Sequence, residues 1–249
     1  MGGMKLNDVV AHLNRLLQVG EIEDYPKAFN GLQLENGGEV TKVAAAVDAC
    51  ETVLVEAIEA GADLLIVHHG LFWNGFAPVT GPAYRKLKLA MESNLAIYSV
   101  HLPLDAHPSL GNNHLLCTAL DLAGDRTPFL DVGLSVSNEI TRAELLSRLH
   151  RVVGKKVHLA PGGPELCRKI GICSGGAGTE IFKAAAAGVD TFITGEGSHW
   201  TYTAAEELGV NLFYAGHYET ETFGVKALAW ELESRFQVPH LFIDHPTGL

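Results

Sequence analysis

The chain twice contains an apolar run that ends at a histidine, with a carboxylate four positions later. The two copies are His101 with Asp105 and His217 with Glu221. Short apolar runs of this kind are typical of buried strands, and open α/β sheets place their sites just beyond the carboxyl ends of such strands. The repeat therefore predicts an α/β fold with its chemistry at strand ends. A histidine and a carboxylate present in two copies are what a two-metal centre needs.

Predicted strands and helices alternate on both sides of these motifs. In the first half we expect helices at 5–18, 51–61 and 82–94, and strands at 42–49, 62–69 and 95–105. In the second half we expect strands at 168–176, 189–197, 211–217 and 240–245, and helices at 178–188, 199–209 and 220–236. Short connections between such elements favour largely parallel sheets covered by helices.

The two halves also match outside the histidine motifs. Ala60-Gly61-Ala62-Asp63 corresponds to Ala187-Gly188-Val189-Asp190, and Lys42 falls on Lys169. We interpret the chain as two similar, duplicated α/β halves, residues 1–125 and 126–249. Proline and glycine mark the region from about 125 to 165 as the boundary. A helix at 141–153, with Thr141 and Glu144 as a capping box, belongs to the second half.

Composition limits the classes of protein. Of 249 residues, 47% are hydrophobic and 19% are charged, which indicates a globular chain. The formal net charge of −11 argues against nucleic acid as a partner, because phosphates would be repelled. No apolar run is long enough to span a bilayer, so no membrane partner is expected. The four cysteines form no C-x-x-C motif, which favours reduced thiols and a cytoplasmic location.

His68 and His69 end another apolar run and are further candidate ligands. In a regular strand adjacent side chains point to opposite faces, so one ring would be buried and the other exposed. At a strand end the backbone can turn, and both rings then reach one site. Asp105 is either a turn cap or a ligand, and its register with Glu221 favours a ligand. His101 fits three roles: a ligand, a donor that orients Asp105, or an acid/base group.

Other polar residues lie near the predicted strand ends. If a helix begins near residue 218, His217 and Glu221 share one face of it, and the carboxylate can bridge two ions. Glu196 and Glu219 are either solvated or partners that orient a ligand. His199 is a candidate proton donor in the cleft, with His101 as the other candidate catalytic residue.

Several motifs together resemble one family. They are Asn30-Gly31-Leu32-Gln33, the stretch AGADLLIVHHG, HLPLD with GNN, TGE near Glu196, and GHYETE. The chain resembles the Nif-three-like dinuclear metal-centre family, whose members are also labelled type 2 GTP cyclohydrolase I homologues. The resemblance implies two α/β halves that form one metal cleft, and a toroidal homohexamer. It also implies that two metal ions are held by the following residues: His68, His69, Asp105, His217 and Glu221.

The resemblance leaves the reaction open. Three imidazoles and two carboxylates suit two divalent ions of Zn, Mn, Fe, Co or Ni better than Ca. One interpretation is a metal-dependent hydrolase acting on a small nucleotide, phosphoester or cyclic amide. The other is a non-catalytic metal-binding scaffold or metal-delivery protein. The apolar stretch at 71–79 fits either an interface between copies of the chain or a lid over the site.

Overall fold

The computed structural model describes residues 3–73, 75 and 77–249, and these form two compact units. The first unit comprises the residues up to Leu104 together with Gly224–His245, and the second comprises Asp105–Phe223 with Pro246–Leu249. The predicted boundary at residue 125 differs from this division. Strand β13 (His240–Phe242) pairs with a strand of the first unit, and helix α5 (Asn112–Ala119) packs in the core of the second.

The first unit contains a five-stranded sheet in the order β13-β4-β5-β6-β2. Its central strands are β4 (Val43–Asp48), β5 (Leu64–His69) and β6 (Ala96–Ser99), which run parallel, and β13 is parallel to β4. Strand β2 (Gly31–Leu34) is antiparallel to β6. The largely parallel sheet predicted for this half is therefore confirmed. Strands β1 (Met4–Lys5) and β3 (Glu39–Val40) form a separate antiparallel pair.

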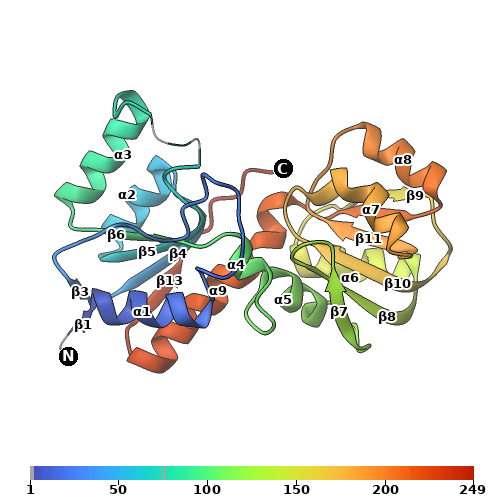
Figure 1. The fold of residues 1–249 in the computed structure, drawn as a ribbon, viewed down its shortest axis with the longest axis horizontal. Helices are drawn as coiled ribbons and strands as arrows, with labels where there is room; N and C mark the ends of the chain where they lie inside the picture. Colours follow the sequence, from blue (N-terminus) through green and yellow to red (C-terminus); the bar gives the residue numbers. More distant parts are fainter. Residues whose placement is uncertain (1–2, 74, 76) are drawn as a thin grey trace. The chain divides into compact units, whose positions relative to one another are not determined.

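Helices pack on this sheet (Figure 1). Helices α2 (Glu51–Glu59) and α3 (Gly81–Glu92) share a buried apolar cluster with alternate residues of β4, β5 and β6. Alternation in a strand sends every second side chain to the other face. The Tyr98 hydroxyl of β6 donates a 2.9 Å hydrogen bond to Asn14 Oδ1 of helix α1 (Leu6–Leu16). Helix α9 (His217–Phe236) is joined to α1 by a 3.1 Å contact of His12 with Glu231.

The second unit contains a six-stranded sheet in the order β7-β8-β10-β11-β12-β9. Strands β10 (Leu166–Cys173), β11 (Thr191–Thr194) and β12 (Asn211–Tyr214) are parallel. The other pairings, made by β7 (Arg126–Phe129), β8 (Gly133–Thr141) and β9 (His158–Pro161), are antiparallel. The prediction of a largely parallel sheet is wrong here, because the segment interpreted as a boundary supplies three antiparallel strands.

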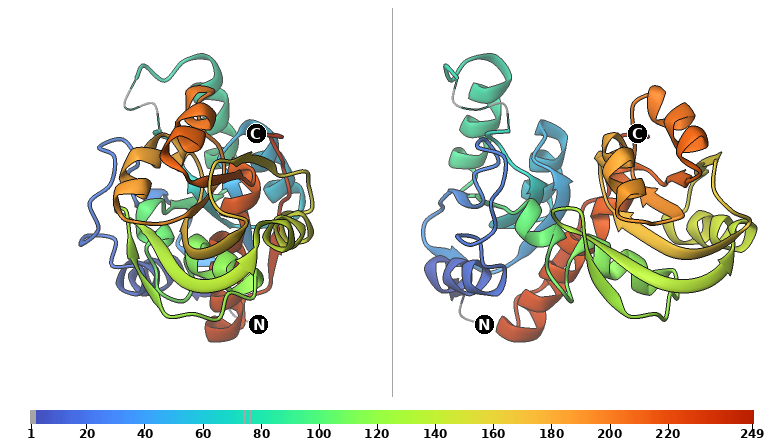
Figure 2. Two further views of the ribbon diagram at one scale, coloured as in Figure 1. Left: turned by 90° about the vertical axis from the view of Figure 1, so that its right-hand side faces the viewer. Right: turned by 45° about the vertical axis from the view of Figure 1, so that its right-hand side comes forward.

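Helices cover both faces of the second sheet (Figures 1 and 2). Helix α5 and helix α6 (Arg142–Val153) pack on one face through a cluster that includes Leu116 and Leu145. A 3-10 turn (Ala177–Glu180), helix α7 (Ile181–Ala186) and helix α8 (Trp200–Leu208) lie on the other. The strand predicted to run to residue 105 ends at Ser99, and the short helix α4 (Leu102–Asp105) follows it with Pro103 in its first turn, where proline is tolerated.

Equivalent residues in the two units make equivalent contacts. Asp63 accepts hydrogen bonds from the backbone N–H groups of Thr41 and Lys42, and Asp190 accepts them from Arg168 and Lys169. The two lysines also bond to matching helix ends, Lys42 to Ala60 O and Lys169 to Ala187 O. These contacts are consistent with the predicted duplication.

Two further sequence predictions concern cysteines and membranes. Cys117, Cys167 and Cys173 are buried, Cys50 is half-buried, and all four are free thiols. Throughout the described ranges no helix combines the length and apolar character that a bilayer crossing requires. Of the predicted apolar stretch 71–79, Asn74 and Phe76 lie outside the described residues, while Trp73 and Val79 are exposed.

Candidate metal site

Three histidines gather at the carboxyl end of the first sheet. His68 and His69 end β5, and His101 follows β6, the next strand. The imidazole centroids lie 4.9 Å apart for His68 and His69, and 4.8 Å apart for His68 and His101. One ring nitrogen from each of the three lies within 4.8 Å of the others, which is a spacing that can hold a metal ion. The two adjacent rings thus converge, as the strand-end argument predicts.

Each of these rings is oriented through its Nδ1 atom. Val100 O lies 3.0 Å from His68 Nδ1, Asp48 Oδ1 lies 2.9 Å from His69 Nδ1, and Asp24 Oδ1 lies 2.9 Å from His101 Nδ1. An acceptor at Nδ1 fixes the tautomer with its proton there. Nε2 is then the atom that each ring would offer to a metal.

Asp24 is the carboxylate that holds His101. Its side chain is only 6% exposed, and it also accepts hydrogen bonds from Asn30 Nδ2 at 2.8 Å and Leu102 N at 2.9 Å. Burial raises the pKa of Asp24, but the hydrogen bonds from His101 and Asn30 outweigh burial and leave the pKa below its usual value. Asp24 is therefore an ionised anchor for the His101 ring.

Aromatic side chains border the histidine group. The Trp73 ring lies 4.7 Å from the His101 ring, edge to face, and 5.3 Å from the His69 ring. Trp73 is 38% exposed, so it covers the group without sealing it. Gly70, which follows the histidine pair, faces the Gln33 amide so closely that a Cβ would overlap it.

In the second unit, His217 and Glu221 occupy the first turn of α9. Their side chains meet at 3.2 Å from Nε2 to Oε2, one helical turn apart. Glu196 Oε1, beyond the end of β11, lies 2.9 Å from His217 Nδ1. Burial lowers the pKa of His217, but the hydrogen bonds and charges of Glu221 and Glu196 outweigh it and raise the pKa to about 9. The prediction that His217 and Glu221 share a helix face is confirmed.

A glycine makes room for the Glu221 carboxylate, which is 3% exposed. Gly175 follows β10 with φ +66°, and a Cβ at this position would overlap Glu221 Oε1. The Gly175 N–H donates to Thr220 Oγ1 at 3.0 Å, which ties this turn to α9. A side chain is therefore excluded both by space and by backbone conformation.

Asp105 is held by polar side chains and is 6% exposed. Its Oδ1 accepts from Asn112 Nδ2 at 2.8 Å and from Ser174 Oγ at 3.0 Å. The Asn113 side chain links the backbones of Asp105 and Ser174, because it donates to Asp105 O and accepts from Ser174 N. These donors hold the carboxylate in one orientation, which is the support that metal-binding carboxylates usually receive.

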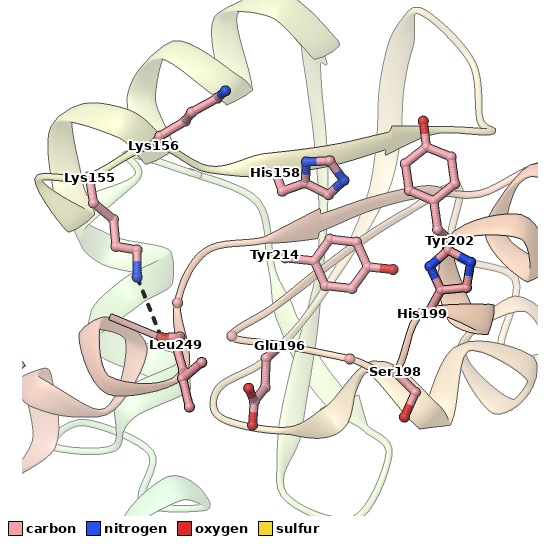
Figure 3. A pocket seen from close by; sticks show the side chains of 12 residues that line it. Lys155, Lys156, His158, Glu196, Ser198, His199, Tyr202, Tyr214 and Leu249 are labelled. Carbon is pink, nitrogen blue, oxygen red and sulfur yellow. Dashed lines mark hydrogen bonds between the residues drawn. The ribbon is translucent and has the colours of Figure 1, made fainter. Parts of the chain in front are cut away.

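The second unit contains a pocket of about 590 Å³ (Figure 3). Glu196, the residue that holds His217, lines this pocket, and so does His199. Glu219 pairs instead with Lys155 at 3.0 Å. Of the two predicted orienting carboxylates, Glu196 contacts a candidate ligand and Glu219 contacts a lysine.

The donor set suits a divalent transition metal. It combines imidazole nitrogens with buried carboxylate oxygens, and each anchored ring has a carboxylate or carbonyl acceptor at its Nδ1 atom. Such second partners are the usual companions of metal-bound histidine. The residues present therefore fit the metal that the family resemblance implies.

Comparison with known proteins places the chain in a family. The profile of Duf34/NIF3 (NGG1p interacting factor 3) matches residues 4–248. The chain belongs to the Duf34/NIF3 family. A Deinococcus radiodurans relative called GTP cyclohydrolase 1 type 2 homolog is 38% identical, over 100% of this chain and 96% of its own. A Pyrococcus horikoshii relative with the same label is also 38% identical, over 99% of this chain and 100% of its own.

Solved structures of this family share the fold. A Thermus thermophilus protein of known crystal structure is 39% identical in sequence to this chain. The two structures superpose with a TM-score of 0.92, and the match covers 99% of this chain and 100% of that chain. The family resemblance drawn from the HHG and GHYETE motifs is thus confirmed.

Within this Duf34/NIF3 chain, each unit brings some of the predicted residues together. His68, His69 and His101 meet in the first unit, and His217 meets Glu221 in the second. His199 lies in the pocket, where its neighbours Glu196 and Tyr202 also lie. The sequence prediction did not include the anchoring residues Asp24, Asp48, Asn112 and Ser174.

Proposed function

We propose that the chain binds two divalent metal ions through His68, His69, Asp105, His217 and Glu221. The observation that carries this proposal is the anchoring of the imidazoles: four rings have an acceptor at Nδ1, three of them carboxylates. We assign His69, Asp105 and Glu221 to one ion and His68, His217 and Glu221 to the other, so that Glu221 is shared. Zn, Mn, Fe, Co and Ni all accept such mixed nitrogen and oxygen ligands.

We further propose that the chain is a metal-dependent hydrolase for a nucleotide, a phosphoester or a cyclic amide. The pocket lined by Glu196, the residue that holds His217, supports an enzyme, because catalysis requires space for a substrate near the metal ligands. Relatives labelled GTP cyclohydrolase 1 type 2 homolog support the same class. When bound, divalent ions supply Lewis-acid activation of water and of an electrophilic substrate group.

The protein groups then have distinct tasks. His101 moves a proton at Nε2, because Asp24 fixes its ring through Nδ1 and stabilises the protonated imidazole. Trp73 limits the access of water to that ring. His199, on the pocket wall, is the second candidate proton donor.

The burial of the proposed ligands favours a second function. His68 is fully buried, and Glu221 and Asp105 are nearly so. Ligands enclosed in this way suit a metal-binding scaffold or metal-delivery protein, whose site requires no vacant coordination position.

Turnover separates these two functions. We expect metal-loaded protein to hydrolyse at least one member of a panel of nucleotides, phosphoesters and cyclic amides. His101→Gln should reduce turnover on the order of 10²–10⁴-fold while metal content is retained. Exposed His150→Gln, on α6, is the matched control and should leave turnover unchanged. Full metal content with no turnover of any panel member would support the scaffold instead.

We also propose a homohexamer in the cytoplasm, as the family resemblance implies. The exposed apolar residues Trp73, Val79 and Tyr84 support a contact between copies of the chain. Light scattering should give six times the chain mass of 26.7 kDa, and a monomer at all concentrations would exclude it.

A further inference from the structure

Two lysines and two histidines line the pocket of the second unit. Lys155, Lys156, His158 and His199 share this lining with one acidic side chain, Glu196, and Lys155 also pairs with Glu219 at 3.0 Å. Basic side chains concentrated in one concave site of an acidic protein attract an anion there. In Figure 3 the two lysines lie at one end of the pocket, and His199 and Tyr202 lie at the other.

Aromatic rings form one wall of the pocket. The His158 ring lies 5.7 Å from the Tyr202 ring and 5.8 Å from the Tyr214 ring, tilted by 36° and 32°. Tyr214 is held in place by a 2.7 Å hydrogen bond between its hydroxyl and Thr201 Oγ1. These centroid spacings are those of rings already in contact, so a planar ligand would stack on the exposed side of the cluster and not between its members.

Donors at the lysine end already bind an oxygen. Lys155 Nζ donates to Leu249 O at 3.4 Å, and the His217 N–H, at the start of α9, donates to the same oxygen at 2.9 Å. Figure 3 shows Lys155 directed towards Leu249. The corner therefore presents an ammonium group and a helix N–H to an oxygen atom.

We propose that this pocket binds a small molecule that combines a planar aromatic or heteroaromatic ring with a phosphate or carboxylate group. The ring stacks on Tyr202, His158 and Tyr214, and the anion pairs with Lys156, because Lys155 already pairs with Glu219. The volume of about 590 Å³ is that of a typical small-molecule site. Binding requires no metal. That the bound molecule is also the substrate rests on the proposed hydrolase, because Glu196 joins the pocket wall to His217.

Adenosine 5′-monophosphate is a suitable probe, since stacking on aromatic side chains tolerates any base. Metal-stripped protein is titrated by calorimetry with this compound, with ribose 5-phosphate, which lacks the ring, and with adenosine, which lacks the anion. We expect the nucleotide to bind at least about tenfold more tightly than either fragment. No binding of the nucleotide at millimolar concentration, or equal binding of ribose 5-phosphate, would overturn the proposal.

Variants locate the binding in this pocket. Tyr202→Leu should weaken the binding of the nucleotide at least about fivefold and leave the binding of ribose 5-phosphate unchanged, because only stacking is lost. Lys156→Gln should weaken the binding of both phosphate compounds and reduce the salt dependence of that binding. Trp230→Leu on α9 and Lys88→Gln on α3, both exposed, are matched controls that should bind like the parent. A Tyr202→Leu protein that is folded by circular dichroism and binds like the parent would refute the assignment.

These titrations are independent of the proposed hydrolase. Nucleotide binding without turnover by metal-loaded protein would leave the pocket assignment intact and remove the enzymatic function. Turnover by metal-loaded protein, together with no nucleotide binding by metal-stripped protein, would support the hydrolase and overturn the pocket assignment.

Discussion

Gly175 shows how tightly the residues around Glu221 are fitted. A Cβ at this position would overlap the Glu221 carboxylate, and φ is +66°. Gly175→Ala should therefore displace Glu221 and lower both metal retention and thermal stability. Gly209→Ala is the matched control, because Gly209 has φ +70° with no atom within 4 Å of an added Cβ. The control should lose only about 1–2 kcal/mol of unfolding free energy, with metal retention unchanged. Equal metal retention in both variants would contradict this account.

His217 gives a pH dependence in the metal-stripped protein. Its folded-state pKa is raised to about 9, above the unfolded value of about 6.5. The protonated ring is favoured by folding, so its contribution is fully present below about pH 6.5 and is lost as the pH rises through about 9. Urea unfolding between these limits should show stability falling with pH.

Glu221→Gln tests the cause of that pH dependence. The substitution removes the charge of the partner 3.2 Å from His217 Nε2, so the His217 pKa should fall and the slope should weaken. NMR titration of the imidazole measures the pKa directly. A His217 that titrates near its ordinary value in the parent would refute the prediction.

At the level of single residues, the sequence predicted the side chains that follow strands and offered Glu196 as an anchor for one of them. It did not predict the other anchoring side chains. His68, His69, His101 and His217 follow apolar runs, which is a local signal. Asp24 reaches His101 across 77 positions of the chain, so no local pattern connects them. Asn112 belongs to the GNN motif, but only the fold shows that it holds Asp105.

Among the elements, α6 has a cap that the sequence predicted. Thr141 Oγ1 accepts the Glu144 N–H at 3.2 Å, and Gly154 ends the helix with φ +69°. Thr141→Ala should lower the free energy of unfolding by about 1 kcal/mol, and Thr141→Ser should largely preserve it. Chemical denaturation measures both, and an unchanged alanine variant would contradict the capping role.

Parallel strands flanked by helices were more predictable than antiparallel ones. Strands β4 and β5 are apolar runs that are buried over most of their length, which is the pattern of a strand covered on both faces. Strands β7 and β9 carry exposed and half-buried residues and contain proline, so they resemble loops in sequence. Their strand character depends on pairing with β8 and β12, which is a tertiary effect.

At the scale of the whole molecule, the proposed ligands come from both compact units. The first supplies His68 and His69, and the second supplies Asp105, His217 and Glu221. Helix α9 begins in the second unit with two of these ligands and continues into the first. The chain therefore leaves the first unit after Leu104 and returns to it at Gly224, so a single boundary at residue 125 does not describe the two units.

The central claim is tested most directly by counting metal ions. Purified protein is loaded with Zn²⁺ or Mn²⁺, freed of excess metal by gel filtration, and measured by elemental analysis. We predict about two equivalents per chain for the parent, and a loss of both in Glu221→Ala, because the shared carboxylate holds the pair together. Exposed Glu233→Ala, further along α9, should retain the parent content. Fewer than one equivalent in the parent, or full retention in Glu221→Ala, would contradict the account.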